Sequence, residues 1–238
     1  LSRFFTPVNF PVSIQQKRVY KTVHSYSKIS STMALEKGIA ELVEKFIAAG
    51  RPSSRQQSIA QRREGYIASA VLAGETETRV DIQTIELEGM TLRIVSPLNA
   101  PTLLPTIIYY YGGCFVSGGF ATHDNQLRQL AYYGQCRVIA VQYRLAPEHT
   151  FPAAHDDAQR GAEIVWQHAE RLGVDKQRIT LAGDSAGGHL ALVTALRLKR
   201  AGEWQPAQLI LIYPMLDATA HFESYIRNGH DYIITRDT

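Results

Sequence analysis

Ser185 lies in the run 183–187, which reads G-D-S-A-G, and a serine flanked by small residues at this spacing can act as a nucleophile. The strand-like run 178–182 precedes this pattern, and the helix-forming run 186–200 follows it. In so tight a turn only small residues fit, and the strained backbone lifts the serine hydroxyl above the sheet edge. The alternative is a glycine-rich turn in which the serine only caps the following helix.

A nucleophilic serine also needs a group that takes its proton and donors that stabilise the oxyanion formed at the carbonyl. Gly112 and Gly113 come directly after an apolar run and leave their backbone N–H groups unshielded. With the N–H of Ala186, the residue after the serine, they are predicted to form an oxyanion hole. The alternative is an ordinary glycine turn that ends a strand.

The elements that position these turns are predicted from periodicity. Four runs are too continuously apolar for exposed strands and predict a parallel sheet buried on both faces: 106–111, 137–143, 178–182 and 208–213. Runs with helical periodicity separate these strands: 125–133, 154–171 and 186–200. Upstream, two helical runs and a β-hairpin are predicted: 35–47, 54–72, and 80–88 with 90–96.

Composition excludes several classes of protein. The 238 residues are 45% hydrophobic and 20% charged, as in globular proteins, and contain no apolar run of the roughly 18 residues that a membrane span needs. Residues 1–32 hold five basic and no acidic residues, so the other 206 carry 20 basic against 22 acidic, which argues against nucleic-acid binding. Cys114 and Cys136 suggest neither a disulfide framework nor a metal site, and a reducing, cytoplasmic location is the default.

Four motifs in one order and spacing resemble the hormone-sensitive-lipase-like family of α/β-hydrolase esterases, the acetyl esterase and lipase type. They are the glycine pair 112–113, Y-R-L-A-P-E at 143–148, F-P-A-A-H-D-D at 151–157 and G-D-S-A-G-G at 183–188. The resemblance implies an α/β-hydrolase fold with a mostly parallel sheet, helices on both faces and an N-terminal helical cap. It also implies a Ser-Asp-His triad that hydrolyses short-chain acyl esters through an acyl-enzyme. It implies a small-molecule ester substrate and no cofactor or metal, and it leaves a homodimer open.

By position, Ser185 resembles the family's nucleophile, and Gly112, Gly113 and Ala186 resemble its oxyanion donors. Other charged residues resemble supports of the core or of the serine turn: Arg144, Glu148, Asp156, Asp157 and Asp184. Tyr111 stands where the family has histidine, and Cys114 stands where it has a third glycine. Because the donors are backbone amides, the oxyanion hole can survive both changes, although Cys114 crowds the site.

The domain prediction has three parts: a non-native or disordered leader at 1–32, a helical cap at 33–79 and an incomplete core at 80–238. In the family the acid follows the seventh strand and the histidine follows the eighth. Only the 24 residues 215–238 follow the sixth predicted strand, whereas one βαβ unit takes roughly 30. We therefore expect the last two strands to be missing and the triad Asp and His not to be present in this chain.

The histidines that are present make poor substitutes for the missing base. His189, four residues after Ser185, is predicted to pack within its helix. A surface or loop position is favoured for His123, with a position in the pocket as the alternative. The others have no acid placed to orient them toward the serine or fall in the tail: His149, His155, His168, His221 and His230.

The sequence therefore predicts a serine carboxylesterase of this family that, as this chain alone, is weakly active or inactive. One alternative is a non-catalytic small-molecule-binding protein on the same scaffold, as in plant hormone receptors that resemble the family but lack the triad histidine. Another is an inactive fragment, because exposed apolar sheet would promote aggregation.

Overall fold

The structure, a computed structural model, describes residues 35–50, 56–219, 221–229 and 234. The chain divides into two compact units, residues 1–51 with 231–233 and the remainder. The described part of the first unit contains helix α2 (Lys37–Ala48), whose first turn is capped by the Glu36 carboxylate. The predicted leader at 1–32 lies outside the described residues, and the predicted cap boundary at residue 79 stays a prediction.

The described part of the second unit contains a six-stranded sheet in the order β1-β2-β4-β3-β5-β6. The strands are β1 (Val80–Leu87), β2 (Met90–Pro97), β3 (Leu104–Tyr110), β4 (Arg137–Val141), β5 (Val174–Asp184) and β6 (Gln208–Ile212). Strands β4, β3, β5 and β6 run parallel, while β2 is antiparallel to both β1 and β4. The mostly parallel sheet and the β-hairpin predicted from the sequence are confirmed.

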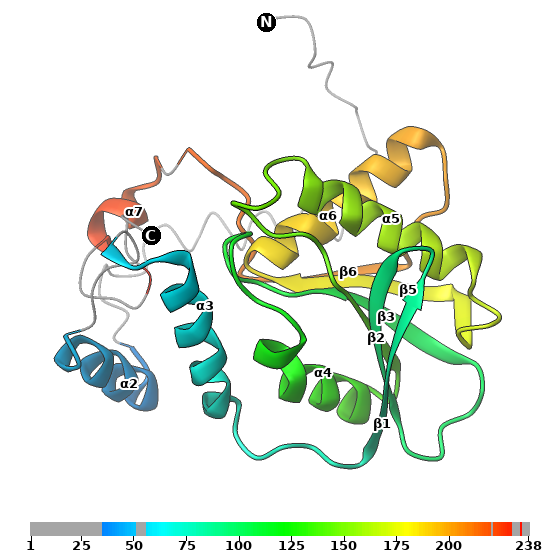
Figure 1. The fold of residues 1–238 in the computed structure, drawn as a ribbon, viewed down its shortest axis with the longest axis horizontal. Helices are drawn as coiled ribbons and strands as arrows, with labels where there is room; N and C mark the ends of the chain where they lie inside the picture. Colours follow the sequence, from blue (N-terminus) through cyan, green and yellow to red (C-terminus); the bar gives the residue numbers. More distant parts are fainter. Residues whose placement is uncertain (1–34, 51–55, 220, 230–233, 235–238) are drawn as a thin grey trace, which may run out of the picture. The chain divides into compact units, whose positions relative to one another are not determined.

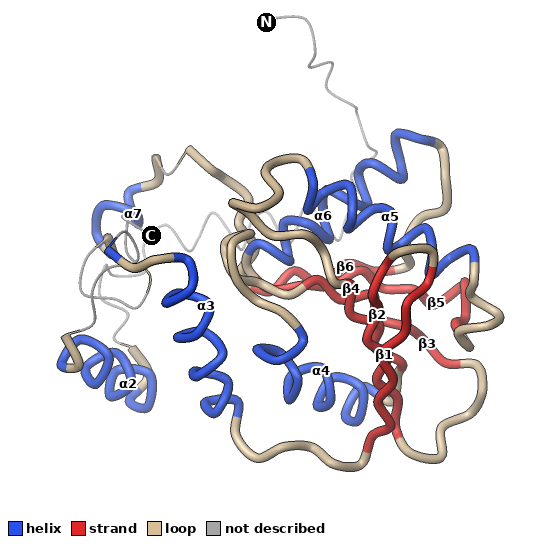
Figure 2. Tube along the Cα trace, viewed as in Figure 1, coloured by secondary structure: helices blue, strands red, loops and turns tan. Residues whose placement is uncertain are grey.

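Among the described residues, three helices cover the two faces of this sheet: α4 (Phe120–Gly134), α5 (Ala153–Gln167) and α6 (Ala186–Ala201). Helices α5 and α6 lie together on one face and α4 lies on the other (Figures 1 and 2). Central strand residues such as Ile108, Ile139 and Leu181 are fully buried. Burial on both faces explains why these strands are continuously apolar in the sequence.

The predicted helix at 154–171 is too long at its end. Helix α5 ends at Gln167, and the turn that follows closes at Gly173 with a φ of 64°. Only glycine adopts this left-handed conformation without steric cost, so the chain turns there directly into β5. Strand β5 therefore begins at Val174, four residues before the predicted run.

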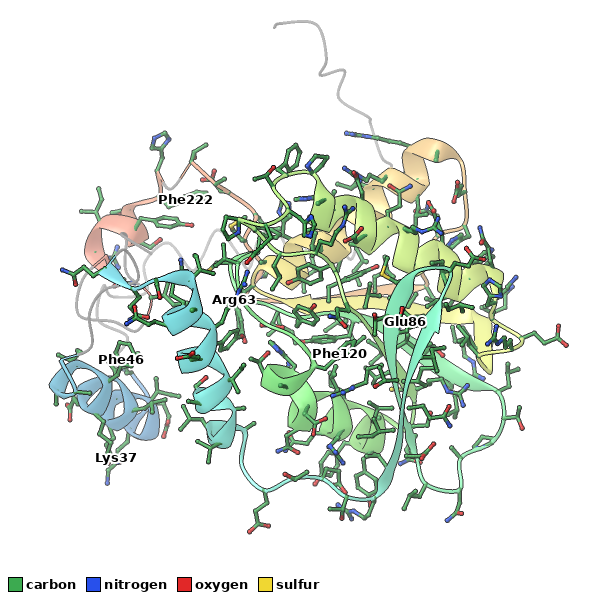
Figure 3. The ribbon with its side chains drawn as sticks, viewed as in Figure 1. Lys37, Phe46, Arg63, Glu86, Phe120 and Phe222 are labelled. Carbon is green, nitrogen blue, oxygen red and sulfur yellow. The ribbon has the colours of Figure 1, made fainter. Side chains whose placement is uncertain are left out.

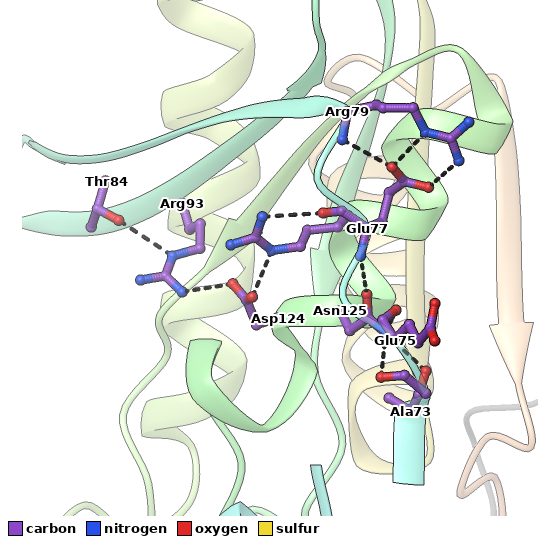
Figure 4. Close-up of polar contacts among 10 residues, drawn as sticks. Ala73, Glu75, Glu77, Arg79, Thr84, Arg93, Asp124 and Asn125 are labelled. Atoms are coloured by element: carbon purple, nitrogen blue, oxygen red, sulfur yellow. Dashed lines mark hydrogen bonds and ion pairs between the residues drawn. The ribbon is translucent and has the colours of Figure 1, made fainter. Parts of the chain in front are cut away.

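Helix α3 (Ile59–Ala68) and the 3-10 turn η3 (Ser69–Ala73) precede the sheet. Ser58 and Gln61 form a capping box that starts α3. The connection from η3 to β1 is held by Asn125 of α4, whose amide nitrogen donates to the carbonyls of Ala73 at 2.8 Å and Glu75 at 2.9 Å (Figure 4). This segment is thus tied to the sheet's covering helix.

Strand β6 forms one edge of the sheet in the part of the chain that is described. It pairs with β5, and its Leu209 and Ile210 side chains are each 40% exposed. Beyond it lies a short helix, α7 (Glu223–Arg227).

The carboxyl ends of the four parallel strands lie together at one end of the sheet. The segments that follow these strands are the loops at 111–119, 142–152 and 213–217 and the turn at Ser185. Ligands of open α/β sheets bind at the carboxyl ends of the strands.

Candidate active site

The nucleophile turn joins β5 directly to α6. Ser185 has φ 52° and ψ −118°, a conformation that costs energy for a residue with a side chain. Its N–H donates to the carbonyl of Ile212 at 2.9 Å, and its carbonyl accepts from the amides of His189 at 3.1 Å and Met215 at 3.2 Å. The strained serine is therefore held by α6, by β6 and by the segment after β6.

Small residues are required where this turn approaches β3. A Cβ atom on Gly187 would overlap the carbonyl oxygen of Tyr110, the last residue of β3. The backbone of α6 can pack this closely against β3 only because residue 187 has no side chain. This contact is the physical reason for the second glycine of the G-x-S-x-G pattern.

The loop after β3 is the predicted oxyanion loop, and its backbone is unusual. Gly113, Cys114 and Phe115 all have positive φ, at 134°, 55° and 61°. The carbonyl of Gly113 accepts from the amides of Val116 at 3.1 Å and Ser117 at 3.0 Å, which closes a tight turn. Cys114 is exposed within this turn.

Asp184 connects the nucleophile turn to the oxyanion loop. Its Oδ1 accepts from the Tyr109 hydroxyl at 2.8 Å and the Gly112 amide at 3.0 Å, and it lies 3.2 Å from His123 Nε2. Burial raises the pKa of Asp184, but the contacts with His123, Tyr109 and Gly112 outweigh it and hold the pKa below its usual value. A buried carboxylate thus fixes both loops, which agrees with the supporting role predicted for Asp184.

The prediction for His123 was wrong. The side chain is only 4% exposed, because α4 places it against the Asp184 carboxylate. Its Nδ1 lies 2.8 Å from Thr122 Oγ1, and aromatic rings surround it: those of Tyr66, Tyr109 and Tyr111. Burial of this ring could not be predicted from the sequence, because its partners come from α3, β3 and β5, which are far from His123 along the chain.

The backbone amides near Ser185 differ in what they contact. The Gly112 N–H is occupied by Asp184, and a Cβ at this position would overlap the Asp184 carboxylate. Among the described residues, no acceptor is bonded to the amides of Gly113, Cys114 or Ala186. These three amides are therefore open to an oxyanion.

Arg63 of α3 holds the oxyanion loop from outside the sheet, a role that the sequence did not predict. Its guanidinium donates to the carbonyls of Val116 at 2.8 Å and Ala146 at 3.1 Å, and it projects from α3 toward these loops (Figure 3). It also pairs with both carboxylate oxygens of Glu148 at 2.8 and 2.7 Å, and this bond lowers the pKa of Glu148 to about 2. The partners are 85 residues apart, so no local pattern could reveal them.

The other predicted supports form ion pairs, one at the start of the loop 142–152 and one between α5 and α6. Arg144 makes a two-pronged contact with Asp157, with both N–O distances 2.8 Å, and the Asp157 side chain is largely buried. Asp156 pairs with Arg197 of α6 at 2.8 Å. The structure places these residues in the supporting roles that the sequence predicted.

No described side chain is hydrogen-bonded to the Ser185 hydroxyl. His155 and His189 contact each other, with 3.0 Å between their Nε2 atoms. His168 pairs with Glu88 at 2.8 Å, in the turn between β1 and β2. His230 lies outside the described residues. In the described part of the chain, no histidine is placed as a base for Ser185.

The described residues contain no group of three or more His, Cys, Asp or Glu side chains that could hold a metal ion. A hollow of about 520 Å³ opens at the amino ends of β3, β4 and β5, lined in part by Ser96, Arg137 and Gly173. It lies at the opposite edge of the sheet from Ser185. Within the described segments, no helix has the length and apolar character to cross a bilayer.

A strained serine between a parallel strand and a helix, beside a loop of open amides, is the arrangement typical of the nucleophile turn in α/β hydrolases. The sequence profile of the family described as alpha/beta hydrolase fold matches residues 107–238, which is more than half of the chain. The chain therefore belongs to this family, in its hormone-sensitive-lipase-like branch of esterases.

Curated relatives and solved structures agree with this assignment. The chain is 37% identical over 164 residues to carboxylesterase NlhH of Mycobacterium tuberculosis, covering 68% of this chain and 51% of the relative. It is 35% identical over 208 residues to an ethyl acetate hydrolase of Pseudomonas putida, covering 83% of this chain and 65% of the relative. A hyperthermophilic esterase from the archaeon Pyrobaculum calidifontis matches with a TM-score of 0.78 at 35% identity, covering 86% and 67% of the two chains. The chain thus spans about half to two thirds of the proteins it resembles.

Proposed function

We propose that this chain belongs to a carboxylic ester hydrolase and carries the groups for its first step, transfer of the acyl group to the enzyme. Ser185 is the proposed nucleophile toward short-chain acyl esters. The observation that supports it best is the strained Ser185 turn, joined through Asp184 to the loop that begins at Gly112. The names of the relatives, carboxylesterase and ethyl acetate hydrolase, suggest a small uncharged ester as substrate. A cytoplasmic location and a homodimer stay predictions.

In this proposal the Ser185 oxygen forms a bond to the ester carbonyl carbon, and the C–O bond to the alcohol breaks as the alcohol leaves with a proton. The oxyanion that forms between these steps accepts from the amides of Gly113 and Ala186, with the Cys114 amide as a third donor. We narrow the predicted donor set in this way because the Gly112 amide is already bonded to Asp184. Each such donor contributes about 3 kcal/mol to transition-state stabilisation.

No residue of this chain is proposed as the general base, and the triad Asp and His are proposed to be absent from it. A serine and an oxyanion hole without a base retain a small fraction of the triad's rate. We therefore expect Ser185 to be acylated slowly by an activated ester. Release of the acyl group by water, which also needs a base, should be slower still.

The test uses p-nitrophenyl acetate with the 238-residue chain. The expected result is release of about one equivalent of p-nitrophenol per chain, followed by a much slower phase. Ser185→Ala should abolish the first phase, whereas Ser224→Ala, the same change at an exposed position in α7, should leave it intact. Equal first phases in the wild type and Ser185→Ala would refute the assignment of Ser185.

A further inference from the structure

Two histidines that the proposed chemistry does not use meet beside the active site. His155 belongs to α5 and His189 belongs to α6, and their Nε2 atoms are 3.0 Å apart. The two rings are nearly perpendicular, at 87°. At this distance one Nε2 must donate a hydrogen bond and the other must accept it.

A hydrogen bond to the Met215 carbonyl determines which ring nitrogens of the pair carry a hydrogen. His189 Nδ1 lies 2.9 Å from the carbonyl oxygen of Met215, and because a carbonyl only accepts, Nδ1 must carry the hydrogen. In a neutral ring, His189 Nε2 is then the acceptor, so His155 Nε2 must be the donor. This leaves His155 Nδ1 without a hydrogen, and it is buried with no described partner.

The pair contacts both the oxyanion loop and the segment after β6 that supports Ser185. The ring of Phe115, in the oxyanion loop, stacks on His155 with centroids 5.6 Å apart and meets the edge of His189 at 5.8 Å. Phe151 packs against His155 at 5.1 Å. The amide of Met215, whose carbonyl His189 holds, donates to the Ser185 carbonyl at 3.2 Å. The histidine pair therefore joins the oxyanion loop to the segment that supports the nucleophile.

The surroundings oppose a positive charge on His155. Burial lowers the pKa of His155, and the neighbouring His189 and Arg197 of α6 lower it further, while Asp156 acts in the opposite direction. Asp156 is itself paired with Arg197 at 2.8 Å. The oxyanion loop and the Phe151 loop contribute aromatic rings to the pair. A proton taken up at His155 Nδ1 would find no acceptor, so charging favours turning the ring toward water and breaking the pair.

We infer that His155 and His189 are positioning residues, a neutral hydrogen-bonded pair that holds Phe115 and Met215 in place and releases them when it takes up a proton. The inference deepens the proposed acyl transfer and rests on it where the rate of acylation is concerned. The hydrogen-bond arrangement of the pair is independent of any activity.

Two variants separate the hydrogen bond from the charge. His155→Gln keeps an N–H that can donate to His189 but cannot titrate, whereas His155→Leu removes the bond. His168→Gln is the matched control, since it removes a histidine that pairs with Glu88 away from the site.

The first measurement is long-range ¹H–¹⁵N NMR of the histidine rings at pH 7.5, together with amide exchange of Met215. We expect His189 to carry its hydrogen on Nδ1 and His155 on Nε2. Protection of the Met215 amide should fall by about tenfold in His155→Leu, corresponding to about 1.4 kcal/mol, and should persist in His155→Gln and the control. A hydrogen on His189 Nε2, or equal protection in all variants, would overturn the inference even if Ser185 is never acylated.

The second measurement is the rate of Ser185 acylation by p-nitrophenyl acetate between pH 5 and 8. In the wild type and His168→Gln, the acylation rate should fall as the pH drops below about 6.5, the usual pKa of histidine. The fall should be steeper than in His155→Gln. Identical profiles for the wild type and His155→Gln would contradict the release on protonation. Loss of acylation in every variant with the NMR result intact would count against the proposed function and leave the hydrogen-bonded pair supported.

Discussion

Replacement of Asp184 by asparagine tests the link between the nucleophile turn and the oxyanion loop. All three contacts of this carboxylate are made by Oδ1, with Tyr109, Gly112 and His123 as partners. Asparagine can keep an oxygen at that position but loses the charge. A hydrogen bond to a charged group is stronger than one between neutral groups by about 1 kcal/mol, so Asp184→Asn should lower the free energy of unfolding by about 3 kcal/mol.

Asp184→Ala should cost more, because it leaves three buried donors without an acceptor. Each such donor costs about 1–3 kcal/mol, which gives a loss of about 5 kcal/mol or more. Urea unfolding followed by far-UV circular dichroism measures both changes. If Asp184→Asn matches the wild type within about 0.5 kcal/mol, or if Asp184→Ala is no worse than Asp184→Asn, the proposed link is wrong.

Asp184→Asn should also change how the free energy of unfolding depends on pH. The pKa of Asp184 is lower in the folded chain than its usual value, so the unfolded chain binds the proton more readily. This contribution to the free energy of unfolding is fully present above about pH 4 and is lost as the pH falls through the folded pKa. Asp184→Asn should therefore lose less stability than the wild type on acidification below pH 4.

Three further predictions concern the elements around the site. Gly187→Ala should lower the free energy of unfolding in urea by about 3 kcal/mol, because the new Cβ overlaps the Tyr110 carbonyl, and a neutral effect would refute this close approach. Arg144→Met should lower it by about 2 kcal/mol, because the largely buried Asp157 carboxylate loses the guanidinium and keeps only the amide of residue 144; a loss below about 0.5 kcal/mol would refute a supporting role for the pair. Ile210→Lys should reduce self-association measured by size-exclusion chromatography with light scattering, because a charge blocks strand pairing at the β6 edge, and unchanged association would exclude that edge.

Most of the sheet and the serine turn could be predicted because their signals are local. A strand buried on both faces, such as residues 106–111, is continuously apolar, and a serine turn this tight requires small neighbours. Such patterns record the environment of each residue within a few positions of the chain. The predicted ends of helices and strands were less accurate, as the turn at Gly173 before β5 illustrates.

The contacts that hold the site together could not be predicted in this way. Arg63 reaches Glu148 across 85 residues, and His155 meets His189 across 34. His123 of α4 is buried against Asp184 of β5 and Tyr66 of α3. Each of these contacts depends on how two distant elements lie in space, and the sequence carries no periodic signal for it.

The most direct test of the central claim is a crystal structure of the chain after reaction with a small alkyl fluorophosphonate, whose phosphoryl oxygen imitates the oxyanion. We predict phosphorus bonded to the Ser185 oxygen, with the phosphoryl oxygen about 3 Å from the amide nitrogens of Gly113 and Ala186. An adduct on another residue, or a phosphoryl oxygen that contacts neither amide, would contradict it.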